Sequence, residues 1–327
     1  MKKGKLSEAV LDRAVFKIIR HRRKEVVLRP GIGLDCAGLV FEPDDAIVMS
    51  TDPITGAAKD IGTLAVHITA NDLASNGADP VGIMVTALLP ERLSESKFKV
   101  IMKDIESVCA KLNMEVIGGH TEVTDVVNSP VISVTGVGKI KKDRMLSPKN
   151  MKPGYEIVMT KYAGLEGSAI ISAAKEEELK ERYPSYIIDN AKAFIEEISV
   201  VEDSRVAMKN GAVFMHDVTE GGIFGALWEV AGAAKMGLKV DLKKIPIRQE
   251  TVEICEYFDI NPYMLISSGS MLIVTEDGNA MVDALMSAGI NAAVVGRLME
   301  GKDRIIVNGE ETRYLESPSC DELYKVK

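Results

Sequence analysis

The sequence predicts an α/β (α+β) protein of two domains. At 327 residues the chain is longer than one hydrophobic core usually supports, so two domains of roughly 150 residues each are expected. Short apolar runs typical of strands alternate with segments of helical period. The polar stretch 141–156, with two prolines and a Pro-Gly turn near its end, separates the halves. We therefore expect domains over residues 1–148 and 149–327.

The first half alternates strands with helices. In order, we expect a helix capped by Ser7, a glycine-broken segment 30–43, a strand 46–52, a central helix from Asp60, a strand 81–90, a helix from Ser94, and strands 115–123 and 131–140. The two longest strands are followed by turn signals and not by glycine loops of the nucleotide-binding type. A split βαβ, ferredoxin-like arrangement therefore fits this half better than a Rossmann fold.

The second half reads as another α/β unit. In order, we expect a strand 156–161, a turn at Gly164 and Gly167, two or three helices, a strand 212–216, the turn 217–222, a helix containing Trp228, and strands 271–276, 292–298 and 304–309.

Composition excludes several classes of protein. The formal net charge of −8 argues against nucleic acid or an anionic membrane as the main partner, and the basic run 21–24 reads as a solvated turn. Because the chain shows no membrane-length apolar run and no signal-peptide core, we expect a cytoplasmic protein. Its cysteines are isolated, which suggests neither a zinc site nor a disulfide framework.

The central helix carries polar residues on a face of their own. Asp60, His67 and Asn71 recur at helical spacing beside an apolar stripe, and Gly77 fits a C-terminal cap. Asn71 and Asp72 therefore fall in the last two turns. An Asp there is unfavourable against the helix dipole unless a cation or a hydrogen-bond donor compensates it, so a metal or a nucleotide nearby is one interpretation.

Two familiar nucleotide motifs are absent from the sequence. Gly31 and Gly33 begin like a dinucleotide fingerprint, but Cys36 and a following strand break it, and no P-loop pattern occurs. If the chain binds ATP, it does so by another kind of site.

Acidic residues lie where loops meet strands or helices. Carboxylates delivered by several loops suit a magnesium–triphosphate site, and paired glycines such as Gly118 and Gly119 let backbone amides approach phosphate. Each carboxylate also has a structural reading as a turn or cap residue. The candidates are Asp35, Asp52, Asp60, Asp72 and Glu122.

Two histidines follow apolar strand sequences. His120 and His216 suit either a catalytic acid or base or a hydrogen-bond partner of other side chains. After His216, Asp217 or Thr219 is expected to cap the next helix, whose N-terminus could bind an anion.

Five segments in order across nearly the whole chain resemble the PurM-like, AIR synthase-related superfamily. Its members include aminoimidazole ribonucleotide (AIR) synthetase, selenophosphate synthetase, thiamine-monophosphate kinase and the hydrogenase maturation factor HypE. The matching segments are GIGLDCAGL, STDPIT, DIGTLAVHITANDLASNGADP, GGHTEV and HDVTEGG.

The resemblance implies an ATP-dependent enzyme with an N-terminal AIR-synthase domain, which binds ATP and magnesium and dimerises, and a C-terminal AIR-synthase domain. ATP would phosphorylate a carbonyl oxygen to prepare it for dehydration or displacement. Carried over by position, the metal ligands are Asp35, Asp52 and Asp72, and these three with Asp60, Asn71, Gly118 and Gly119 contact the nucleotide. The candidate catalytic groups are His120, Glu122, His216 and Asp217.

Among these members the chain is most similar to HypE, which also implies a possible maturation-factor partner. Two features differ: HypE ends in Pro-Arg-x-Cys, whereas Cys320 is followed here by seven residues, and Glu220 replaces an arginine. Cys320 could act as an acceptor thiol only if the tail folds back into the site. A thiamine-phosphate-type kinase and a non-catalytic ATP-binding partner protein are the alternatives.

Overall fold

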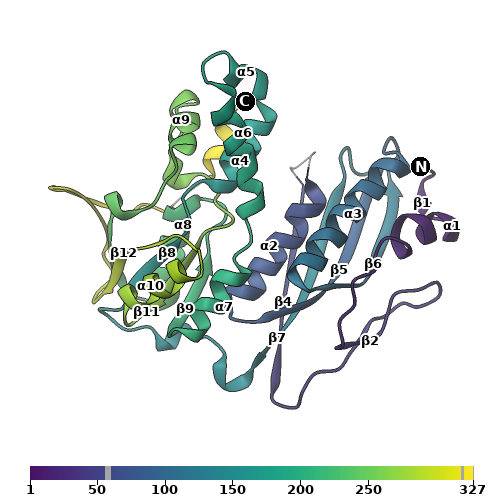
Figure 1. Cartoon of the computed structure of the whole chain (residues 1–327), viewed down its shortest axis with the longest axis horizontal. Helices are drawn as coiled ribbons and strands as arrows, with labels where there is room; N and C mark the ends of the chain where they lie inside the picture. The colour runs from purple at the N-terminus through teal and green to yellow at the C-terminus, as the bar shows by residue number, and fades with distance from the viewer. Residues whose placement is uncertain (56–59, 318–319, 327) are drawn as a thin grey trace. The chain divides into compact units, whose positions relative to one another are not determined.

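The computed structural model describes residues 1–55, 60–317 and 320–326. The chain forms two compact units (Figure 1). Unit 1 comprises Met1–Ala74 and Ala78–Met145, and unit 2 comprises Ser75–Gly77 and Leu146–Lys327.

Unit 1 is built on a five-stranded sheet in the order β1-β6-β5-β7-β4. Strand β7 pairs antiparallel with both β4 and β5, and β5 pairs parallel with β6. The predicted split βαβ is confirmed, because β7 lies between the two strands that α2 connects. The elements are β1 (Gly4–Lys5), β4 (Asp45–Ile54), α2 (Ile61–Ser75), β5 (Asp79–Pro90), α3 (Glu95–Leu112), β6 (Glu115–Thr124) and β7 (Val131–Lys141).

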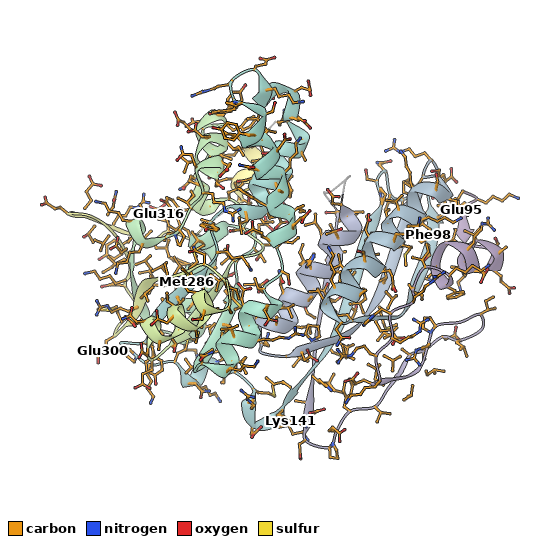
Figure 2. The ribbon with its side chains drawn as sticks, in the orientation of Figure 1. Glu95, Phe98, Lys141, Met286, Glu300 and Glu316 are labelled. Atoms are coloured by element: carbon orange, nitrogen blue, oxygen red, sulfur yellow. The ribbon has the colours of Figure 1, made fainter. Side chains whose placement is uncertain are left out.

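Helices α2 and α3 cover one face of this sheet (Figure 1). A Cβ on Gly136 of β7 would lie 2.5 Å from Thr69 of α2, so that helix packs directly on the strand. Phe98 of α3 is fully buried, whereas Glu95 lies at the polar start of the same helix (Figure 2). On the opposite, open face, the side chains of Ile47 and Met49 are 56% and 62% exposed.

The N-terminal segment of unit 1 differs from the prediction. The single helix expected from Ser7 is a short α1 (Glu8–Leu11) that continues as the π-helix η1 (Asp12–Phe16). The Ser7 side chain makes no capping hydrogen bond. A two-stranded hairpin of β2 (Val26–Leu28) and β3 (Gly38–Leu39) follows.

Unit 2 contains a seven-stranded sheet in the order β14-β13-β10-β12-β8-β11-β9. Its strands are β8 (Glu156–Thr160), β9 (Ala212–Asp217), β10 (Gly237–Asp241), β11 (Met271–Thr275), β12 (Ala292–Met299), β13 (Arg304–Asn308) and β14 (Glu311–Tyr314). Strands β10 and β14 were not predicted, because a charged residue interrupts the first and the second is exposed throughout.

Helices of unit 2 form two hydrophobic clusters. Helix α8 packs with the sheet, while α4, α6 and α9 enclose a separate core around Phe194 and Leu165. The α-helices are α4 (Leu165–Ala174), α5 (Glu176–Lys180), α6 (Ser185–Ala193), α7 (Val201–Lys209), α8 (Gly222–Ala234), α9 (Gln249–Tyr257) and α10 (Gly278–Ser287). The short 3₁₀ turns of this unit are Pro148–Asn150, Phe194–Glu197, Leu242–Lys244, Pro262–Met264 and Glu322–Lys325, and Lys142–Arg144 is a 3₁₀ turn of unit 1.

Within the described residues, the helices fall short of the length and apolar character that a bilayer-crossing segment requires.

Candidate functional site

A cavity of about 430 Å³ lies at the edge of strand β6 in unit 1. One wall is the loop 30–37 between β2 and β3, and another is β6 from residue 116 to 121. The cavity brings together four of the residues that the sequence assigned to nucleotide binding or catalysis. These are Asp35, Gly118, Gly119 and His120.

The two glycines of β6 have different requirements. Gly119 has a φ of +147°, and a Cβ there would lie 1.9 Å from the carbonyl oxygen of Val85. A Cβ on Gly118 would instead make an ordinary contact of 3.5 Å with Met84. Of the two, only Gly119 is therefore required for the close approach of β6 to β5. Because glycine has no side chain, the cavity wall at this position consists of backbone.

His120 and Glu122 project from the same strand onto the open face of the sheet. The register places His120 opposite Thr86, and the His120 Nε2 atom lies 3.4 Å from Glu122 Oε2. Both side chains remain more than 40% exposed, at 43% and 42%. The pair stays open to solvent, and its part in proton transfer remains a prediction.

Asp52 and Asp72 lie together on the helix-covered face. Ser50, opposite Gly136 in the register, hydrogen-bonds to Asp72 in the last turns of α2 and lies 3.4 Å from Asp52 Oδ2. The predicted position of Asp72 near the end of α2 is confirmed. At this helix end the dipole makes a carboxylate unfavourable unless a cation or a hydrogen-bond donor compensates it. The Ser50 hydroxyl is such a donor for Asp72.

The sheet separates these two groups of candidate residues within one chain. Ser50 and Asp52 point to the helix side. Thr51 points to the open face, where its Oγ1 atom lies 2.9 Å from Oγ1 of Thr135 on β7. Among the described residues, no three His, Cys, Asp or Glu side chains are close enough to hold a metal ion. The metal set of Asp35, Asp52 and Asp72 remains a prediction.

The remaining candidates of unit 1 lie at and within helix α2. Asp60 precedes the helix with a φ of +62°, and its carbonyl accepts the amide of Leu64. Burial raises the pKa of the Asp104 carboxyl, and the negative charge of Asp60 adds to this shift. Asn71 is 1% exposed, within the helix layer. Its assignment to the nucleotide remains a prediction.

In unit 2, His216 is paired with a carboxylate that sequence reasoning missed. The His216 Nε2 and Glu229 Oε2 atoms are 2.7 Å apart, and this contact lowers the pKa of Glu229. Glu229 lies on α8, thirteen residues along the chain. Asp217 ends β9 and is 5% exposed.

The N-terminus of helix α8 is capped from the C-terminal tail. Asp321 accepts hydrogen bonds from the amides of Gly221 at 2.7 Å, Ile266 at 3.2 Å and Leu323 at 2.8 Å. The expectation that Asp217 or Thr219 caps this helix is wrong, because the cap residue is Gly221. Burial raises the pKa of Asp321, and the three amides oppose that shift.

The tail also places Cys320 beside α8. The thiol is exposed and lines an open pocket of about 270 Å³ with Glu220, Trp228 and Glu229. Cys320 therefore lies at the segment that contains Glu220 and Gly221. No sequence pattern marked this arrangement, because its partners are distant along the chain.

Both units match known family models. Residues 33–140 match the AIR synthase related protein N-terminal domain, and residues 152–308 match the C-terminal domain of the same family. These two matches span most of the chain, so it belongs to the AIR synthase related family. They confirm the predicted PurM-like fold.

Within that family, the chain is similar to hydrogenase maturation proteins. It is 28% identical to a putative hydrogenase expression/formation protein of Methanocaldococcus jannaschii, over 95% of this chain and 96% of that one. It is 27% identical to the carbamoyl dehydratase HypE of Rhizobium leguminosarum bv. viciae, over 79% and 75%. The crystal structure of Escherichia coli HypE has the same fold, with a TM-score of 0.82 at 19% identity over 98% of this chain and all of that one. The predicted resemblance to HypE is confirmed.

Proposed function

We propose that the chain uses ATP to dehydrate a carbamoyl group. The observation that carries the proposal is the cavity of unit 1, which is lined by both Asp35 and the glycine pair of β6, within the region that matches the family model. Relatives of similar length are named carbamoyl dehydratase HypE. A HypE of the same fold was solved in complex with ATP, which supports the choice of nucleotide.

In the net reaction the carbamoyl group loses one water, and ATP is converted to ADP and phosphate. The carbonyl oxygen of a carbamoyl thioester attacks the γ-phosphorus of ATP, and the bond from that phosphorus to the bridging oxygen breaks to release ADP. The carbonyl carbon then loses phosphate, which carries the oxygen away, while the nitrogen loses its protons and a nitrile forms. Positioning and charge stabilisation are the main tasks of the protein in such phosphoryl transfer.

Magnesium fits the carboxylates on the helix-covered face. Asp52 and Asp72 offer oxygen ligands, the kind that magnesium prefers, and Ser50 already holds them in one cluster. We propose that these two hold the ion, which would neutralise charge on the phosphates, and that Asp35 joins them or contacts phosphate. Within one chain the sheet separates His120 and Glu122 from these carboxylates, so their role in taking the proton from the substrate nitrogen remains a prediction.

We further propose that two chains dimerise through the open face of unit 1. Ile47 and Met49 of β4 are 56% and 62% exposed, and Met84 of β5, on the other side of β7, is 36% exposed. Exposed apolar side chains on one sheet face favour an interface there. We propose a maturation-factor partner protein by analogy, because a chain of the HypE–HypF complex has the same fold as this protein.

Product analysis tests the reaction and its alternatives. Purified protein is incubated with magnesium-ATP and S-carbamoyl-N-acetylcysteine, and phosphate and the S-cyano product are measured; we expect both in equal amounts. Phosphoryl transfer to thiamine monophosphate would instead identify a kinase. ATP binding without either reaction would identify a non-catalytic partner. An Asp72→Asn variant is expected to lose product formation, while Asp125→Asn, in an exposed ion pair with Lys3, keeps it.

A further inference from the structure

The loop 30–37 forms one wall of the cavity but has little packing of its own. Its apolar residues Ile32 and Leu34 are 57% and 51% exposed, and Gly33 has a φ of +76°. Within the loop, the amide of Leu34 bonds to the carbonyl of Gly31 in a tight turn. The pairing of Leu28 with Gly38 closes its base. A loop of this kind keeps one position only if something outside it holds its ends.

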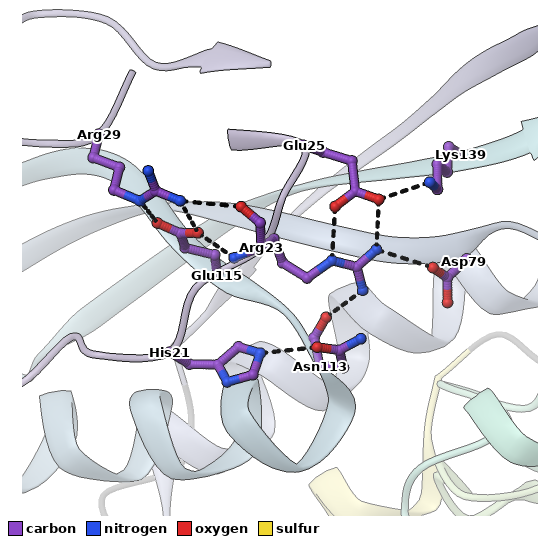
Figure 3. Close-up of polar contacts among 8 residues, drawn as sticks. All are labelled: His21, Arg23, Glu25, Arg29, Asp79, Asn113, Glu115 and Lys139. Atoms are coloured by element: carbon purple, nitrogen blue, oxygen red, sulfur yellow. Dashed lines mark hydrogen bonds and ion pairs between the residues drawn. The ribbon is translucent and has the colours of Figure 1, made fainter. Parts of the chain in front are cut away.

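A bidentate ion pair supplies that anchor at the start of the loop. Arg29, next to Pro30, donates from Nε to Glu115 Oε1 at 2.7 Å and from Nη2 to Oε2 at 3.3 Å (Figure 3). Glu115 is fully buried and also accepts the amide of Arg23 at 2.6 Å. The Arg29 Nη2 atom completes the contact by donating to the Arg23 carbonyl at 3.0 Å. Two parallel hydrogen bonds of this kind fix the relative orientation of the Arg29 and Glu115 side chains as well as their separation.

The anchor residue belongs to the strand that forms the opposite wall. Glu115 is the first residue of β6, and Gly118, Gly119 and His120 follow on the same strand. The pair therefore links the loop that carries Asp35 directly to the glycines across the cavity.

A second ion-pair group steadies the segment before the loop. Arg23 donates to Glu25 at 3.0 and 3.1 Å and to Asp79 at 3.2 Å, while Lys139 donates to Glu25 at 2.7 Å (Figure 3). Arg23 is 8% exposed, so the interpretation of residues 21–24 as a wholly solvated turn is wrong for this residue. This group attaches the segment before the loop through the Arg23 side chain, so the fork of Arg29 on Glu115 is a separate contact at the start of the loop.

We propose that Arg29 and Glu115 are positioning residues that set the distance between the Asp35 loop and the Gly118–Gly119 wall for nucleotide binding. The inference rests on the proposed function, since it concerns the same cavity. Buried ion pairs are often replaceable by neutral residues at little cost in stability, so geometry is what this pair contributes. A displacement of about 1 Å in a binding site can cost about a hundredfold in activity.

The test uses a double variant that leaves no unpaired buried charge. Arg29→Met with Glu115→Gln is compared with wild type for magnesium-ATP affinity by titration calorimetry, for thermal midpoint, and for hydrogen exchange of residues 30–37 without nucleotide. We expect a Kd raised about tenfold or more, equivalent to about 1.4 kcal/mol. Hydrogen exchange of residues 30–37 should become faster, while exchange of the β6 amides stays slow.

Two further variants separate positioning from stability. Arg29→Lys keeps the charge but loses the fork, and we expect it to bind ATP with an affinity between those of the wild type and the double variant. Arg248→Met with Glu197→Gln removes a bidentate pair of unit 2, with contacts of 2.8 and 2.9 Å, and should leave the Kd within about twofold.

The outcomes for the two proposals are distinguishable. Failure of the wild type to bind ATP would overturn the proposed function, while faster loop exchange in the double variant would still support the anchor. A wild type that binds ATP, with a double variant of unchanged Kd and unchanged loop exchange, would overturn the inference alone.

Discussion

The carboxylate of Asp321 caps helix α8 by accepting the amide of Gly221 at 2.7 Å, so the C-terminal tail completes the core of unit 2. Asp321 is 2% exposed and the neighbouring Glu322 is 3% exposed, which is unusual for acidic residues in a chain terminus. Glu322 accepts the Asn261 amide at 3.2 Å and pairs with Lys325 at 2.7 Å. The segment after Cys320 is therefore docked on unit 2.

We expect Asp321→Ala to destabilise unit 2 by about 2–3 kcal/mol, because it removes one cap and leaves buried amides without an acceptor. Urea unfolding measures the change. The control is Asp277→Ala, which removes the exposed cap that accepts the Ala280 amide at 3.0 Å and should cost about 1 kcal/mol. Equal losses in the two variants would contradict the role of the tail.

The two glycines of β6 should respond differently to the same substitution. Gly119→Ala is expected to cost about 3 kcal/mol or more and to weaken ATP binding, because its Cβ would overlap the Val85 carbonyl at 1.9 Å. Gly118→Ala meets only the end of Met84 at 3.5 Å and should change stability little. Thermal unfolding of both variants checks the contrast, and a tolerated Gly119→Ala would show that β6 runs differently.

Acid should weaken unit 1 through Glu25. The hydrogen bond from Arg23 lowers the Glu25 pKa to about 2 from 4.5, against the opposing effect of burial. Because the unfolded state binds the proton more readily, stability from this group is present above about pH 4.5 and is lost as pH falls toward 2. The loss is at most about 3 kcal/mol.

Urea unfolding between pH 7 and pH 3 measures this dependence. A Glu25→Gln variant should be less stable at neutral pH and should lose less stability on acidification than the wild type. Parallel pH profiles for the two proteins would contradict the assignment.

Alkylation should distinguish the cysteines by exposure. Cys36 and Cys320 are exposed, whereas Cys109 and Cys255 are buried. Burial raises the pKa of the Cys109 thiol, and it raises that of Cys255 to about 12. Since the thiolate reacts, iodoacetamide at neutral pH should label only the first two in the folded protein. Peptide mass spectrometry, with a urea-unfolded sample as the fully labelled control, reads out the pattern. Early labelling of Cys109 would contradict its burial.

Local patterns in the sequence were enough to predict much of the fold. The helix around Asp72 and the apolar strands follow from hydrophobic period, and Gly77, with a φ of +76°, terminates α2 as expected. The family motifs likewise identified the cavity residues Asp35 and Gly119, because the glycine and acidic positions are local signals.

Contacts between residues far apart in the chain could not be predicted from such local patterns. Asp321 bonds to amides 100 and 55 residues away, and Arg29 meets Glu115 across 86 residues. An isolated acidic or basic residue in the sequence does not reveal which backbone group or charge it will meet. The division of the candidate site by the sheet was also hidden, because neighbouring residues such as Thr51 and Asp52 point to opposite faces.

The most direct test of the account is the thermal midpoint of the purified protein with and without magnesium-ATP. At about a hundred times its Kd, a ligand adds about 2.7 kcal/mol, which raises the midpoint by several degrees in units of this size. We expect a rise that requires magnesium, is lost in Asp72→Asn and persists in Asp125→Asn. No rise in the wild type at millimolar magnesium-ATP would contradict it.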